Sequence, residues 1–116
     1  MKNTEMLKKN YEFRLVLEKG KFYVEKELQI VVLKNNKKNN FLGIAIGTKN
    51  GKAFQRNRAK RIIRECYKNL EEQIIEGNTI VVLIKKDFNL KELKYKEVFE
   101  LMKNCFKKAK IVKEEE

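Results

Sequence analysis

The spacing of apolar residues changes twice between Phe41 and Ile84, and this change constrains the fold more than any other feature of the sequence. Residues 41–48 carry an alternation typical of a β-strand, at Leu42, Ile44 and Ile46. Apolar residues then recur every three or four positions, the period of a helix with one buried face, at Ala59, Ile63, Cys66, Leu70 and Ile74. Gly77 ends this helix, and residues 79–84, TIVVLI, indicate a strand that is covered on both faces. The sequence therefore predicts a strand, a helix and a second strand in that order.

An earlier helix is predicted over residues 10–19. Asn10 is a residue type that caps helix N-termini well, and Gly20 stands where a helix commonly stops. One side of this helix is apolar, with Phe13, Val16 and Leu17.

A β-hairpin is predicted next along the chain. Residues 28–33 form a β-branched apolar run, and the polar segment 34–40, KNNKKNN, leads from it into the strand at 41–48. We expect these two strands to pair across that turn.

The last predicted element is a helix whose apolar stripe comprises Tyr95, Val98, Met102, Cys105 and Ala109.

The resulting order of elements is αββαβα. A chain of 116 residues has the length of one domain with one modest core. We therefore expect a single α+β domain over residues 1–116, an α/β sandwich in which a central basic helix and a C-terminal helix pack on a small mixed sheet. Residues 113–116, KEEE, are expected to be a frayed end.

The charge of the chain predicts a polyanionic partner. Lys and Arg number 28 against 16 acidic residues, and the net charge is +12. Nucleic acid is the usual partner of such a surface, because every neutralised phosphate releases a counterion. An anionic membrane is the alternative, but there is no apolar run of about 18 residues and no signal-peptide segment after Met1. We therefore expect a cytoplasmic protein with no membrane partner.

The segment 56–64, RNRAKRIIR, concentrates this charge on one side of the central helix. At 100° per residue, one arc of about 140° contains six polar residues: Arg56, Asn57, Lys60, Arg61, Arg64 and Lys68. The buried stripe lies opposite. Like charges at i,i+4 repel each other by a few tenths of a kcal/mol, whereas an ordinary solvated helix face mixes Glu with Lys. This pattern favours an external anion such as RNA phosphate, to which guanidinium and amide groups are suited. Arg58 falls outside the arc. It is expected either to pair with a carboxylate such as Glu65 or to lie at the flank of the helix.

Residues for intrinsic catalysis are scarce. The chain has no histidine, and Asp87 is its only aspartate. Glu71, Glu72 and the glutamates at 114–116 are interpreted as solubilising charge. Cys66 and Cys105 fall on apolar helix sides and are expected in the core. With no histidine and no CxxC pair, a metal site is not expected. Because histidine is absent and the carboxylates are scattered, no intrinsic active site is expected in this chain either.

Three segments carry a resemblance to the bacterial ribonuclease P protein family. Residues 51–65, GKAFQRNRAKRIIRE, resemble that family's Arg-Asn-Arg signature helix. Residues 7–20 are similar to its opening helix, and residues 42–53, LGIAIGTKNGKA, to its second-strand segment. The resemblance covers nearly the whole chain and is weakest after Leu90. It implies an αββαβα fold with a left-handed βαβ crossover, against the usual handedness.

The resemblance also implies a function. The chain would be an accessory subunit of the endoribonuclease ribonuclease P, which removes the 5′ leader of precursor tRNA. Its partners would be the ribonuclease P RNA, which carries out the reaction and holds the Mg²⁺, and precursor tRNA. We expect a monomer in a one-to-one complex and no small-molecule substrate. A non-catalytic ribosomal or RNA-assembly protein is the alternative, which charge alone does not separate.

Two sets of site residues follow from the resemblance. The catalytic RNA is expected on Arg56, Asn57, Arg58, Lys60, Arg61, Arg64 and Lys68, and the tRNA leader on a cleft formed by Phe13, Val16, Leu17, Val31 and Lys49. The alternative for Phe13 and Leu17 is burial against the sheet. Family members commonly have an aromatic residue where this chain has Val31, so Phe41 and Tyr23 are the candidates for a ring that stacks on a leader base.

Overall fold

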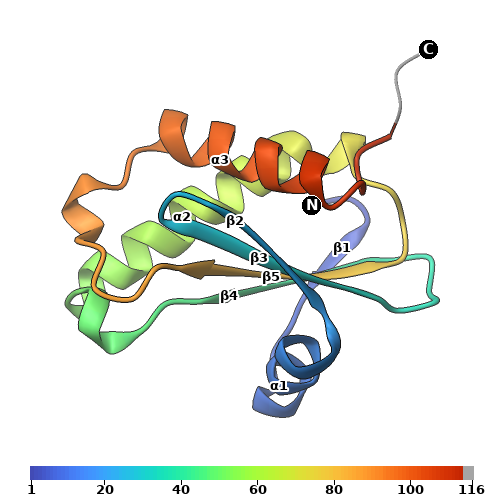
Figure 1. Ribbon diagram of the computed structural model, residues 1–116, viewed down its shortest axis with the longest axis horizontal. Helices are drawn as coiled ribbons and strands as arrows, with labels where there is room; N and C mark the ends of the chain where they lie inside the picture. The colour runs from blue at the N-terminus through green and yellow to red at the C-terminus, as the bar shows by residue number, and fades with distance from the viewer. Residues whose placement is uncertain (114–116) are drawn as a thin grey trace.

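The computed structural model of the protein describes residues 1–113, which form a mixed five-stranded sheet with helices on both faces (Figure 1). Helix α1 covers one face, and helices α2 and α3 cover the other. The strands are β1 (Thr4–Met6), β2 (Lys21–Glu25), β3 (Leu28–Lys34), β4 (Asn40–Ala45) and β5 (Asn78–Ile84). The helices are α1 (Asn10–Lys19), α2 (Ala53–Leu70) and α3 (Tyr95–Lys108), with short 3-10 turns η1 (Thr48–Asn50), η2 (Glu71–Gln73) and η3 (Leu90–Glu92). The predicted α/β sandwich is confirmed. Among residues 1–113, no helix is both long and apolar enough to span a membrane.

The sheet has the strand order β1-β4-β5-β3-β2. β4 and β5 are parallel neighbours joined through α2, so the predicted strand–helix–strand unit is present. The left-handed crossover stays a prediction. β3 pairs antiparallel with β5 and with β2, and β1 pairs parallel with β4.

The predicted hairpin between residues 28–33 and 41–48 is wrong, because β5 lies between β3 and β4. β5 is apolar on both faces and therefore takes the central position, where both faces are covered. β3 instead forms a hairpin with β2, a strand the sequence analysis missed, and Lys26 in its turn has φ of 52°. β2 was missed because Phe22 and Val24 point away from the main core and are exposed.

Helix α1 has the predicted bounds but not the predicted cap. The residue before the first turn is Lys9, and the Glu12 carboxylate accepts a hydrogen bond from its N–H at 2.9 Å. The helix stops at Gly20 because the chain passes close to β3 there. A Cβ on Gly20 would lie 2.6 Å from both the Val16 carbonyl oxygen and Cγ1 of Val31.

The larger core lies between the sheet and the two helices α2 and α3. Four residues of the predicted stripe are buried on α2: Ala59, Ile63, Cys66 and Leu70. The helix ends at Leu70 and not at Gly77 as predicted, so Ile74, the fifth residue of the stripe, is buried beyond the helix in extended backbone. Tyr67 of α2 meets Phe106 of α3 edge to face, with ring centroids 6.3 Å apart. Both cysteines are buried and free, as predicted. A smaller cluster on the other face packs α1 onto the sheet through Val16, Val31 and Val81.

Glu71 corrects the interpretation of Glu71 and Glu72 as solubilising charge. Glu71 is only 8% exposed, and its carboxylate accepts hydrogen bonds from the backbone N–H groups of Lys2 at 2.7 Å and Asn3 at 3.3 Å. Burial raises the pKa of this carboxyl, but the Thr4 hydroxyl and the two N–H groups outweigh it, so the pKa lies below its ordinary value. Glu71 thus ties the N-terminal segment to the end of α2. Glu72 is exposed and pairs with Lys2 at 3.7 Å.

The C-terminal end also differs in part from expectation. The N–H of Lys113 donates to the carbonyl of Gln73 at 2.7 Å, so this residue is held against η2 and is not frayed. The other residues of the expected frayed end, 114–116, lie outside the described residues.

Candidate nucleic-acid interface

The six residues predicted on one side of α2 form a cationic arc: Arg56, Asn57, Lys60, Arg61, Arg64 and Lys68. Four of them are exposed, and Arg56 and Lys60 are half-buried. Within residues 1–113 the side-chain ion pairs join Lys2 to Glu72 and Lys108 to Glu25, and neither involves the arc. The arc is therefore not neutralised by carboxylates of the described chain, and it presents its charge to solvent.

Two arginines of this helix also hold backbone. Arg56 donates from Nη1 to the Gly51 carbonyl at 2.7 Å, which fixes the start of α2. Arg58 donates to the carbonyls of Leu90 at 3.5 Å and Leu93 at 3.1 Å. Arg58 therefore joins α2 to η3 and is not paired with Glu65. A guanidinium has five donors, so Arg56 retains donors for a phosphate, whereas Arg58 lies outside the arc with its guanidinium on these two carbonyls.

The middle of the arc surrounds a groove. Lys60, Arg61 and Arg64 line a hollow of about 440 Å³ together with Asn57 and Phe54. Three cations and an amide around one hollow match the charge and hydrogen-bonding capacity of phosphate groups. We call this hollow the arc groove.

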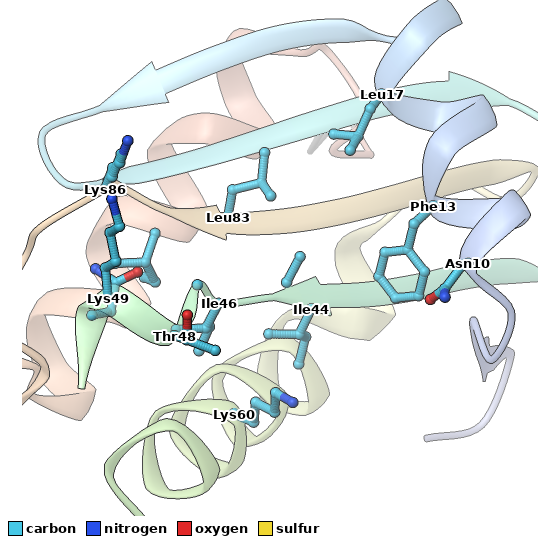
Figure 2. A pocket seen from close by; sticks show the side chains of 14 residues that line it. Asn10, Phe13, Leu17, Ile44, Ile46, Thr48, Lys49, Lys60, Leu83 and Lys86 are labelled. Carbon is cyan, nitrogen blue, oxygen red and sulfur yellow. The ribbon is translucent and has the colours of Figure 1, made fainter. Parts of the chain in front are cut away.

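A second hollow, of about 680 Å³, lies between α1 and the ends of β4 and β5 (Figure 2). Its floor is apolar and its rim carries three lysines. The apolar residues include Phe13, Leu17, Ile44, Ile46 and Leu83, and the polar ones are Asn10, Thr48, Lys49, Asn50, Lys60 and Lys86. Figure 2 shows Phe13 and Leu17 descending from α1, with Lys49 and Lys86 at the opposite end of the hollow. We call this hollow the α1 cleft.

The structure brings only part of the predicted leader set to this cleft. Phe13, Leu17 and Lys49 line it. Val16 and Val31 do not, because they are 2% and 0% exposed in the small core under α1. Phe13 and Leu17 are half-buried, so they pack against the sheet and still face the cleft.

Neither candidate ring replaces the missing aromatic residue. Tyr23 packs against the larger core, on the sheet face opposite α1. Phe41 is not among the residues that line the α1 cleft, and Lys37 lies over its ring at 5.3 Å from the centroid. Phe13 is the aromatic residue of the cleft.

Sequence reasoning missed Lys86 and the place of Lys60 in this cleft. Lys49 follows β4 and Lys86 follows β5, and the carboxyl ends of parallel neighbours meet at one edge of a sheet. The buried amide of Asn50 fixes that edge by donating to the carbonyls of Lys85 at 2.9 Å and Phe88 at 3.0 Å. The correct pairing of β4 with β5 would have predicted Lys86.

Groups for acid–base, nucleophilic or metal chemistry do not gather at these surfaces. Within residues 1–113, no three His, Cys, Asp or Glu side chains are grouped so that they could hold a metal ion. Burial, with a smaller effect of Glu65, raises the pKa of the Cys66 thiol to about 12. Burial, with Glu25 adding to it, raises that of Cys105 to about 11. These buried thiols are therefore protonated at neutral pH.

Comparisons with known proteins agree with this geometry. The family model described as Ribonuclease P matches residues 1–110. The ribonuclease P protein component of Clostridioides difficile is 37% identical over 109 residues, which cover 93% of this chain and 94% of that protein. That of Alkaliphilus metalliredigens is 33% identical over 112 residues, 97% and 99% of the two chains. Among solved structures, the RNase P protein of Staphylococcus aureus superposes with a TM-score of 0.81 at 26% identity, covering 92% of this chain and 96% of that one. The protein from Thermotoga maritima gives 0.81 at 29% identity, with coverage of 90% and 96%.

Proposed function

This chain belongs to the bacterial ribonuclease P protein family, and from that premise we propose how its two hollows divide the binding of RNA. The chain is the protein component of ribonuclease P, the endoribonuclease that matures the 5′ end of tRNA. The cationic arc binds the ribonuclease P RNA, and the α1 cleft binds the single-stranded leader of precursor tRNA. Family membership, with a match over residues 1–110, leaves no observation that favours the ribosomal alternative.

The arc binds folded RNA through its phosphates. Arg61 and Arg64 border the arc groove and are exposed, and Asn57 adds an amide beside them. Each phosphate that meets one of these cations releases a counterion, which contributes affinity without regard to sequence. Folded RNA also relieves the mutual repulsion of the arc cations.

The α1 cleft is suited to a single strand. Its apolar floor with Phe13 offers a surface for unstacked bases, and the lysines on its rim lie where a backbone would pass. This combination of an aromatic platform with a cationic rim is how proteins bind single-stranded RNA.

One observation carries the proposal: Lys60 lines both the arc groove and the α1 cleft. The two binding surfaces therefore adjoin, and a leader in the cleft lies next to the RNA on the arc. The protein reduces repulsion between the two RNAs and positions the leader, which favours cleavage through orientation. Mg²⁺ is held by the RNA, the complex contains one copy of each subunit, and the protein acts in the cytoplasm, where precursor tRNA is processed.

Reconstitution tests this proposal. The chain is combined with a bacterial ribonuclease P RNA at low Mg²⁺, and cleavage of precursor tRNA at its mature 5′ end is compared with that by RNA alone. We expect faster cleavage with the protein, and tighter binding of precursor tRNA that has a leader than of mature tRNA. Equal rates with and without protein would contradict the proposal.

Separate variants test the leader site. Lys49→Ala and Phe13→Ala are expected to reduce the preference for leader-containing tRNA and leave the affinity for the ribonuclease P RNA unchanged. Arg14→Ala, an exposed cation on the same helix that does not line the cleft, is the matched control. An unaltered preference in the first two variants would place the leader elsewhere.

A further inference from the structure

Phe54 is the most exposed large apolar side chain among residues 1–113, with 68% of its surface open to solvent. It lies in the first turn of α2, just before Arg56, the first residue of the cationic arc. Single exposed apolar residues are common on protein surfaces, so exposure alone carries no conclusion. Its neighbours decide what this ring can do.

The fold itself makes little use of the Phe54 ring. Within residues 1–113, the ring pairs are Tyr67 with Phe106 and Tyr95 with Phe99. The lysines placed over rings are Lys9 over Tyr11 and Lys37 over Phe41. Phe54 takes part in none of these contacts, and its ring face is available to a ligand.

The ring stands between two hollows. On one side is the arc groove, with Arg61 and Arg64. On the other side is a hollow of about 290 Å³, bordered by Gln55, Arg58, Leu90 and Lys91. Arg61 follows Phe54 by seven residues, which is close to two turns, so it lies on the same face of α2 about 10 Å along the axis. Each of the two hollows beside the ring therefore has cations in its lining, and the smaller one also has the apolar Leu90.

The backbone that carries Phe54 is fixed on both flanks. The N–H of Lys52 donates to Oε1 of Gln55 at 2.8 Å, and Arg56 donates to the Gly51 carbonyl. Arg58 joins the same turn to Leu93. The backbone that carries the ring is therefore ordered before any ligand arrives, which lowers the entropy lost on binding.

We propose that Phe54 is a stacking site for one unpaired nucleobase of the ribonuclease P RNA, whose adjoining phosphates lie on Arg61 and Arg64. Folded RNAs display unpaired bases in loops and bulges, and proteins receive them on exposed rings beside cations. An apolar protein partner would meet uncompensated positive charge on both sides of the ring and is therefore disfavoured. This inference rests on the proposed function, because it assumes that the arc binds that RNA.

Three substitutions at Phe54 test the need for a ring. The dissociation constant for the ribonuclease P RNA is measured for the wild type and for Phe54→Ala, Phe54→Leu and Phe54→Trp. We expect Ala and Leu to weaken binding between about 5-fold and 150-fold, and Trp to retain it. The salt dependence of binding stays that of the wild type, because no cation is removed. Phe22→Ala, a half-exposed phenylalanine on β2, is the control and binds normally.

A spectroscopic measurement separates stacking from mere apolar contact. The chain contains no tryptophan, so Phe54→Trp places a single tryptophan at the proposed site, and its emission can be excited apart from that of the tyrosines. We expect the RNA to quench its emission strongly and to leave that of Phe22→Trp nearly unchanged.

Two results would overturn the inference: unchanged affinity in Phe54→Ala, or no difference in quenching between the two tryptophan variants. If the wild type itself fails to bind the ribonuclease P RNA, the proposed function fails instead. The wild-type titration in the same series distinguishes these failures.

Discussion

The ring of Phe13 lies directly on Gly43, so that a Cβ on Gly43 would be 2.6 Å from Cε1 and 2.9 Å from Cζ of that ring. Phe13 comes from α1 and Gly43 from the middle of β4. Because Gly43 has no side chain, the ring of Phe13 packs directly on β4 and lines the α1 cleft there. Glycine is thus required at position 43 for space, since its φ is not in the left-handed region.

Gly43→Ala is expected to push Phe13 out of place and so weaken leader binding. The affinity of the reconstituted complex for leader-containing precursor tRNA should fall by about 5-fold or more, as when a stacking ring is lost. Overpacking should also lower the free energy of unfolding by about 1–3 kcal/mol. Gly47→Ala adds a Cβ to the same cleft where it meets only Oδ1 of Asn50 at 3.5 Å, so it leaves Phe13 in place and should have the smaller effect. Wild-type leader preference in Gly43→Ala would show that the position of Phe13 does not matter.

Arg58→Ala should lower the stability of the protein, whereas Arg61→Ala should weaken its binding to RNA. Arg58 holds the carbonyls of Leu90 and Leu93, so its loss should lower the free energy of unfolding by about 1 kcal/mol in urea titrations. Arg61 has no such role, and its loss should instead reduce the salt slope of RNA binding by about one. A reduced salt slope in Arg58→Ala would return Arg58 to the RNA-binding set predicted from the sequence.

The elements that were predicted correctly are those whose signal is local. The stripe from Ala59 to Leu70 and the run that became β5 carry their period within one segment, and neighbouring residues decide it. The cationic arc followed from the same helical geometry. Strand pairing is not local: alternation in 41–48 shows that a strand exists, but not that β5 is its neighbour. The hairpin error arose at that step.

The cleft was predicted only in part for the same reason. Lys86 lines the same cleft as Lys49 because β4 and β5 are parallel neighbours, and the wrongly predicted hairpin did not bring these strand ends together. Val31 was placed in the cleft by resemblance, yet the close approach of α1 at Gly20 buries it. Glu71 binds the backbone just before β1, which lies there because β1 pairs with β4. The spacing of apolar residues in the sequence does not predict that pairing.

Lys60→Gln should affect both RNAs, because this residue lines both hollows. We expect weaker binding of the ribonuclease P RNA and, in the assembled complex, a smaller preference for leader-containing tRNA. Arg64→Gln should change only the first affinity, and Lys86→Gln only the second. Titrations of each variant with the two RNAs separate these effects. If Lys60→Gln behaved like either single-site variant, the two surfaces would not be joined at this lysine.

Glu71→Gln is expected to destabilise the protein near neutral pH and to matter little in acid. The pKa of Glu71 is lower in the folded protein than its ordinary value of 4.5, so ionisation favours folding. This stabilisation is complete above the unfolded pKa and is lost as the pH falls through the folded pKa. Urea unfolding should therefore show a gap between wild type and Glu71→Gln at pH 7 that closes toward about pH 2. Glu72→Gln, at an exposed neighbour, should show little gap at either pH. A gap that is constant with pH would mean that the charge on Glu71 does not hold the N-terminal segment.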